Sequence, residues 1–333
     1  MHKSLRSLFR HLSNGRRRRA SLPLIGGLLF VVLLLVLLLF RTPCFILSPD
    51  DTPLAAPPDG ADAGLFSWSS TTVNESDGDL FPLMKQEKLN VLYQNFSSKT
   101  SNPEQMTAFL ETALEEGITV YHLTGHSAWA LDPESKKICE AVETAALYNQ
   151  QTEQTFLEWR KADGKSWDTI PRLNGIMLDI EPYTLDEWDE DADAVMDSFV
   201  SGMKKAYTLA QAHDLQLILC IPWYYEKKGQ QEGLEELIAN GCDSIAVMNY
   251  YRGAEIKNIA LETTLVQKYG KGIITIYELQ KANGRGIKEI NSYHDLGLYA
   301  ARENFAAVQA AYPEQTISVA FHHYRVLEEV LDP

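Results

Sequence analysis

Short apolar runs alternate with amphipathic helical patterns over residues 64–333 of the chain. The runs have the length and the β-branched and aromatic content of strands, and the segments between them have apolar residues at helical spacing, for example over 103–117, 134–161 and 192–214. We expect eight strands, at residues 66–70, 89–96, 118–125, 175–181, 215–224, 243–251, 272–279 and 316–324. Eight strands that alternate with helices predict an α/β fold, the (β/α)8 or TIM barrel.

A doubly wound open sheet is the alternative fold. It usually has fewer strands and a glycine-rich phosphate turn between its first strand and helix. The only comparable sequence, GRG at 284–286, lacks that strand context. The pattern therefore favours the barrel.

The N-terminal segment has a different pattern. Residues 22–40 are apolar and uncharged at about the length that spans a lipid bilayer, and residues 1–21 are rich in Lys and Arg without any acid. Basic residues before the span predict a cytoplasmic tail. The apolar run exceeds the core of a cleaved signal peptide, and no A-x-A site follows it, so we expect a single-pass signal anchor in the cell membrane. Residues 41–63, rich in Pro, Asp and Ala, predict a disordered stalk that carries an extracytoplasmic domain, 64–333.

Charge narrows the classes of partner. The chain has 30 Lys and Arg against 45 Asp and Glu, and eight of the basic residues precede position 42, so the remainder has a net charge of about −23. Such a surface argues against nucleic acid and favours a neutral or amino-bearing substrate. His122 and His126 leave a strand rather than share a helix face, so we expect neither a metal site nor a cofactor.

The segment NGIMLDIEPY at 174–183 carries two acids in an apolar run. Side chains alternate along a strand, so Met177, Asp179 and Glu181 share one face while Ile176 and Ile180 share the other. Burying two charges costs several kcal/mol per ion unless each has a partner. A functional site or a polar network must therefore offset that cost.

Polar and aromatic residues collect at the ends of seven of the predicted strands. In a barrel the carboxyl ends of the strands form the active site. Carboxylates surrounded by aromatic rings suit sugar substrates, because the rings stack on sugars while paired acids act on the glycosidic oxygen. Besides Asp179 and Glu181, the candidates are Tyr93, Asn95, His126, Trp129, Tyr183, Trp223, Tyr224, Asn249, Tyr250, Arg252, Glu278, His322, His323 and Tyr324.

NGIMLDIE resembles the strand-4 signature D-G-x-D-x-D-x-E of family 18 glycoside hydrolases, the chitinases and endo-N-acetylglucosaminidases, and MNY at 248–250 resembles their strand-6 M-x-Y. With LDIEPY, VMNYYR, YEL and FHHY, the chain also resembles uncharacterised glycosidase-like barrels. The resemblance implies that Glu181 is the general acid. It further implies that Asp179 orients an N-acetyl group of the substrate, and that Tyr250 donates a hydrogen bond to that group.

The chain departs from the family pattern at several positions. Asn174 and Met177 replace the first two acids of the signature, Tyr251 replaces an acid that often follows M-x-Y, and no tryptophan ends strand 8. N-acetyl specificity therefore stays open. A second mechanism uses Glu181 and Glu278 as the acid/base and nucleophile of a retaining glycosidase, with carboxyl groups about 5–5.5 Å apart.

The sequence predicts a membrane-anchored, extracytoplasmic glycoside hydrolase that acts on a cell-surface or exported polysaccharide. Three alternatives stay open. In the first, Asp179 and Glu181 only form a buried network with Arg252 or His322. In the second, the barrel binds glycans without cleaving them, and in the third it is an anchored scaffold that binds protein.

Overall fold

The computed structural model describes residues 60–74, 79–132, 134–164, 169–283 and 286–331. The predicted tail and anchor and nearly all of the predicted stalk lie outside these ranges. Within the described ranges, no helix has both the length and the apolar character needed to cross a bilayer.

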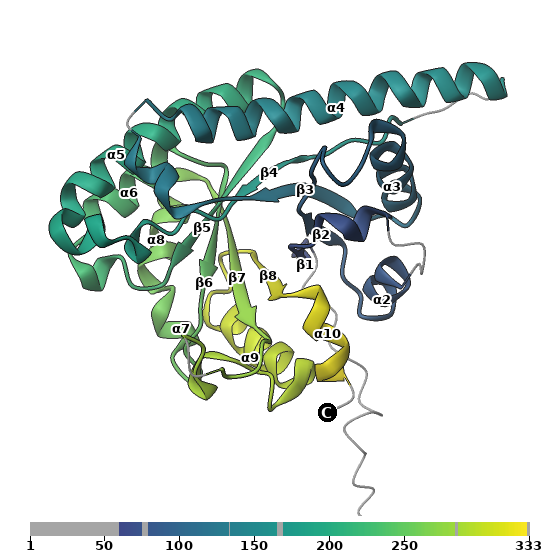
Figure 1. The fold of residues 1–333 in the computed structure, drawn as a ribbon. Helices are drawn as coiled ribbons and strands as arrows, with labels where there is room; N and C mark the ends of the chain where they lie inside the picture. The colour runs from purple at the N-terminus through teal and green to yellow at the C-terminus, as the bar shows by residue number, and fades with distance from the viewer. Residues whose placement is uncertain (1–59, 75–78, 133, 165–168, 284–285, 332–333) are drawn as a thin grey trace, which may run out of the picture. The chain divides into compact units, whose positions relative to one another are not determined.

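Eight parallel strands form a closed barrel, which confirms the predicted fold (Figure 1). Each strand pairs with its neighbours in sequence, and β1 pairs with β8 to complete the ring. The strands are β1 (Ala63–Ser67), β2 (Val91–Gln94), β3 (Thr119–Thr124), β4 (Gly175–Leu178), β5 (Gln216–Pro222), β6 (Ser244–Met248), β7 (Gly272–Glu278) and β8 (Ile317–His322).

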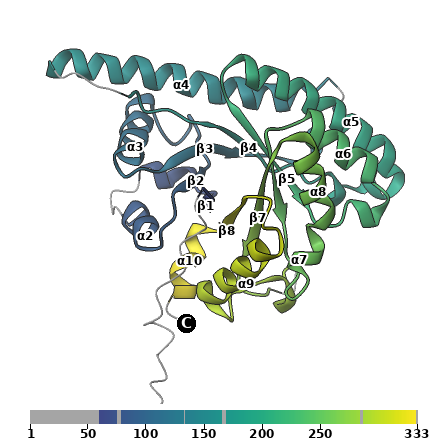
Figure 2. The same ribbon diagram turned by 180° about the vertical axis from the view of Figure 1, so that it is seen from behind.

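The helices pack around the outside of the strands, as the front and rear views show (Figures 1 and 2). They are α2 (Leu80–Gln86), α3 (Pro103–Glu115), α4 (Lys136–Asp163), α5 (Asp186–Ala212), α6 (Gln231–Asn240), α7 (Glu255–Asn258), α8 (Ala260–Tyr269), α9 (Gly297–Ala311) and α10 (Tyr324–Leu331). Short 3-10 helices lie in the loops after five strands: η2 (Ser70–Asn74), η3 (Ser127–Leu131), η4 (Pro182–Thr184), η5 (Glu226–Lys228) and η6 (Glu289–Asn291).

Local sequence explains where the helices begin. At α3, the Asn102 side chain accepts from the Gln105 backbone, the Gln105 side chain accepts in return, and Pro103 occupies the first turn. At α5, Asp186, Glu187 and Asp189 place negative charge in the first turn, where the helix dipole favours it.

The core has two parts. One fills the space between the strands and the helices. The other fills the barrel interior and is made of Phe66, Val91, Tyr93, Tyr121, Leu123, Met177, Ile218, Cys220, Ala246, Met248, Ile274, Ile276 and Ala320. Tyr93 fits there because Gly64 has no side chain: a Cβ on Gly64 would lie 2.6 Å from the Tyr93 ring.

All eight predicted strands are present, with two informative differences in their bounds. β1 begins at Ala63, three residues before the predicted start and inside the predicted stalk. The predicted strand starts too late because Ala63 and Gly64 have weak strand propensity. β4 ends at Leu178, so Asp179 and Glu181 lie just beyond it. The predicted alternation nevertheless continues, since Met177 faces the interior while Ile176 and Ile180 pack outside.

Gly125 lies where the chain after β3 passes the backbone of Asp179. A Cβ on Gly125 would lie 1.8 Å from the Asp179 carbonyl oxygen, so one of the two segments would have to move. We expect Gly125→Ala to lower the free energy of unfolding by about 2 kcal/mol or more in denaturant titration. Ser98→Ala, at an exposed loop position, is the control. Equal stability of the two variants would contradict this close approach.

Candidate active site

A cleft of about 240 Å³ opens at the carboxyl end of the barrel. Its walls come from η4, from the ends of β5, β6 and β7, and from the loop after β7. The lining residues are Glu181, Tyr183, Pro222, Trp223, Tyr224, Met248, Tyr250, Glu278, Gly286, Ile287 and Asn291. Six of the residues predicted from the sequence therefore share one cavity: Glu181, Tyr183, Trp223, Tyr224, Tyr250 and Glu278.

The two acids after β4 are partly buried and close enough to interact. The Asp179 backbone N–H donates to the Thr124 carbonyl at 2.9 Å, which fixes the chain beside β3. The Oδ1 atom of Asp179 is buried and has no hydrogen-bond partner among the described residues. Burial, and next the charge of Glu181, raise the pKa of Asp179 to about 7.

Burial also raises the pKa of Glu181, while a hydrogen bond with Tyr183 lowers it. Asp179 thus retains a proton toward neutral pH, and the pKa of Glu181 is displaced in the same direction. This is a property that general acid catalysis requires.

Glu278 is buried at the end of β7 and accepts several hydrogen bonds. The backbone N–H of Gln280 donates to Oε1 at 2.8 Å, and the Gln280 side-chain nitrogen lies 3.3 Å from Oε2. His322 Nδ1 lies 3.0 Å from Oε2 and 3.3 Å from Oε1. The described partners of this carboxyl group are nitrogen atoms, as expected for a carboxylate that only accepts.

Aromatic rings form much of the cleft wall. The Tyr183 and Tyr224 rings are 5.4 Å apart, and Trp223 contacts Tyr224 edge-on at 5.6 Å. Burial, followed by the charges of Glu278 and Asp179, raises the pKa of Tyr250 well above its usual value. Its hydroxyl thus stays protonated and able to donate.

Three of the predicted binding residues have structural contacts instead. Tyr93 is buried in the barrel interior. Asn95 donates to the Leu123 carbonyl at 2.8 Å, and Asn249 is buried and donates to the Glu255 carbonyl at 3.0 Å. None of the three is among the cleft-lining residues, so their predicted contact with substrate gains no support.

The other predicted residues lie at the rim or behind it. His126 is exposed and accepts from the Ala128 N–H, and Trp129 packs against the outer core. His323 accepts from the Arg325 N–H, and Tyr324 is buried at the start of α10.

The proposed buried network around the β4 acids has a different composition from the prediction. Arg252 pairs with Asp295 at 2.9 Å, because both lie in the loops that follow β6 and β7. His322 pairs with Glu278 rather than with Asp179 or Glu181. The two β4 acids therefore have neither predicted partner in direct contact.

Sequence reasoning missed Trp68, Gln280 and Asn291. Trp68 stands in the middle of the predicted first strand, whereas the actual strand ends one residue before it. Asn291 comes from the loop after β7, where no periodic pattern marks the residues that turn back to the cleft. A tryptophan directly after a strand end is the signal that identifies Trp68, provided that the first strand is predicted to end at Ser67.

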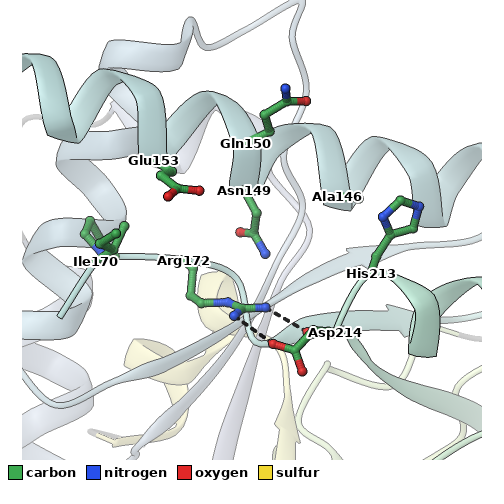
Figure 3. A pocket seen from close by; sticks show the side chains of 9 residues that line it. Ala146, Asn149, Gln150, Glu153, Ile170, Arg172, His213 and Asp214 are labelled. Atoms are coloured by element: carbon green, nitrogen blue, oxygen red, sulfur yellow. Dashed lines mark hydrogen bonds and ion pairs between the residues drawn. The ribbon is translucent and has the colours of Figure 1, made fainter.

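A second cavity, of about 370 Å³, lies at the opposite end of the barrel (Figure 3). Arg172 precedes β4 and donates to the Asp214 carboxylate at 3.0 Å and to its carbonyl at 2.7 Å. The Asn149 amide pairs with the Leu173 backbone in both directions. These contacts join α4 to the amino ends of two strands, the end of a barrel associated with stability rather than chemistry.

The raised pKa of Asp179 predicts a pH-dependent gain in stability for Asp179→Asn. Below about pH 4 the folded and unfolded states both hold the proton, so the pKa difference has no effect. Between about pH 4 and 7 only the folded state holds it, so the free energy of unfolding falls as pH rises. Above pH 7 the folded state bears the full cost of a buried, ionised Asp179. Asn has no such cost.

We expect Asp179→Asn to raise the free energy of unfolding by roughly 1–4 kcal/mol at pH 8 and by little at pH 4. Denaturant titration at both values measures it, and Asp189→Asn, on the exposed first turn of α5, is the control. An equal gain in the free energy of unfolding at the two pH values would show that the pKa of Asp179 is not raised in the folded protein.

Comparisons with known proteins leave the family open. No family model matches the chain, and no curated protein matches it. A solved structure that resembles it is the C-terminal domain of a putative chitinase from Desulfitobacterium hafniense DCB-2, with 11% identity over 68% of this chain and 71% of that one and a TM-score of 0.41.

Two further structures resemble the chain. Fungal β-1,4-galactanase is 11% identical over 78% of this chain and 88% of that one, with a TM-score of 0.45. D-psicose 3-epimerase from Clostridium cellulolyticum H10 is 14% identical over 81% and 89%, also with a TM-score of 0.45. Likenesses of this degree assign no activity to the chain.

Proposed function

We propose that the barrel is a glycoside hydrolase that uses Glu181 as its general acid and acts on a polysaccharide. The observation that carries the proposal is the composition of one cleft. Carboxyl groups from the ends of β4 and β7 line it together with Tyr183, Trp223, Tyr224 and Tyr250. Paired carboxyl groups supply acid/base chemistry, and aromatic faces bind sugar rings.

In the mechanism that the contacts favour, Glu181 protonates the glycosidic oxygen and Glu278 attacks the anomeric carbon. The bond to the leaving sugar breaks as the bond to a Glu278 oxygen forms. Glu181, now ionised, then takes a proton from water, which attacks the anomeric carbon and releases Glu278. The raised pKa of Glu181 suits the first role, and the donors around Glu278 suit the second.

Substrate-assisted catalysis is the second candidate mechanism. The Oδ1 atom of Asp179 lacks a partner and the group retains a proton near pH 7, so Asp179 is able to contact an N-acetyl group of the substrate. Tyr250 is an additional donor beside it. Sugars without an N-acetyl group separate the two mechanisms, because only the Glu278 mechanism hydrolyses them.

Glu181→Gln removes the proton donor while it keeps the side-chain size. We expect the full-length variant to release reducing ends from a polysaccharide panel at least about 100-fold more slowly than the parent. The panel includes chitin, deacetylated glucosamine polymers and β-linked neutral glycans. Glu187→Gln, the same change on the exposed start of α5, is the control and should keep parental activity.

Loss of activity in both variants would point to a general effect of charge. If the parent binds a polymer in the panel but releases no reducing ends from any, the barrel is a glycan-binding protein and the hydrolase proposal fails.

We further propose that residues 22–40 anchor the protein in the cell membrane, with the barrel outside the cytoplasm. The uncharged apolar run and the basic residues before it support this topology. We expect the full-length protein to stay in the membrane fraction after alkaline carbonate washing, and deletion of 22–40 to release it. Cells are stripped of the layers outside the cell membrane while that membrane stays intact. Protease added from outside should then digest the barrel. Protection of the barrel in such cells would contradict the orientation.

A further inference from the structure

Trp68, His322 and Glu278 form a continuous chain of polar contacts behind the cleft. The indole nitrogen of Trp68 lies 3.0 Å from Nε2 of His322, and Nδ1 of the same ring lies 3.0 Å from Oε2 of Glu278. His322 and Glu278 are register partners on β8 and β7, and Trp68 follows β1, which pairs with the other side of β8. Three adjoining strands therefore set the spacing of this chain.

The contacts define the protonation of His322. An indole N–H only donates, so Nε2 must be the acceptor and cannot hold a proton. A neutral imidazole holds one proton, which is then on Nδ1 and directed at the Glu278 carboxylate. The Gln280 side-chain nitrogen, 3.2 Å from Nδ1, consequently directs its own N–H to Glu278 and not to the ring.

The nearest neighbours of the His322 ring are two other rings. Phe66 lies against it edge-on, with ring centroids 5.5 Å apart, and the His323 ring lies 5.0 Å away. Asp179 and Glu181 also lie within electrostatic reach. A positive charge on His322 would lower the pKa of both acids.

We propose that Trp68 and His322 are positioning residues for the two-carboxylate reaction. Trp68 holds His322 as the neutral Nδ1–H tautomer, and His322 holds the Glu278 carboxylate in one orientation. Assigning Glu278 as the nucleophile rests on the proposed glycosidase function, whereas the tautomer of His322 does not.

The tautomer is measured without any substrate. The full-length protein is labelled with 15N at histidine, and His322→Asn identifies the His322 signals by their loss. At pH 7 we expect one unprotonated nitrogen at Nε2 and one protonated nitrogen at Nδ1. In Trp68→Phe we expect part of the His322 population to hold its proton on Nε2 instead, because the indole donor is gone. An Nε2–H tautomer, or a doubly protonated ring in the parent at pH 7, would refute the proposal.

The catalytic consequence is measured on whichever polymer the parent cleaves. We expect Trp68→Phe to lower kcat by roughly 10- to 100-fold with KM changed little, because substrate binding is kept while the orientation of Glu278 is lost. Trp159→Phe, the same change in α4, should match the parent.

His322→Asn, which can keep an N–H near Glu278, should retain more activity than His322→Leu. Equal loss in these two variants, or parental kcat in Trp68→Phe, would show that the chain of contacts is only structural. If the parent cleaves nothing while His322 has the expected tautomer, the glycosidase function fails and the assignment of the ring stands.

Discussion

The closure of the barrel by the pairing of β1 with β8 is the interaction on which the rest of the structure depends. It completes the backbone hydrogen bonding of the sheet, so that every strand has two neighbours. It also places the residue after β1 beside the ends of β8 and β7. The contacts among Trp68, His322 and Glu278 exist only in the closed ring, so the geometry of one side of the cleft is a property of the whole barrel.

The other side of the cleft is governed by the cost of placing negative charge in a poorly hydrated site. Asp179 has a buried oxygen without a partner among the described residues, and both β4 acids have raised pKa values. Glu278 instead has hydrogen-bond donors at both of its oxygens. The cleft therefore contains carboxyl groups in two different environments. The proposed acid and the proposed nucleophile differ in this way.

The sequence was sufficient for the fold because strand period, helix period and their alternation are local properties. The eight strands and the positions of Glu181, Tyr250 and Glu278 at strand ends followed from them. Contacts between distant segments were not predictable in this way. Tyr93 fits in the barrel interior because Gly64 has no side chain against its ring, and Arg252 pairs with Asp295 from another loop. Trp68 was missed because Ala63 and Gly64 do not look like the start of a strand.

The raised pKa of Asp179 has a thermodynamic consequence for ligand binding. Any ligand that contacts Asp179 changes the hydration of this group, and thereby changes how many protons the protein holds near neutral pH. Binding is then coupled to proton exchange with the solvent. The heat measured on binding will contain the ionisation enthalpy of the buffer, and it will differ between buffers of equal pH. Calorimetry in two such buffers therefore counts the protons that the site exchanges.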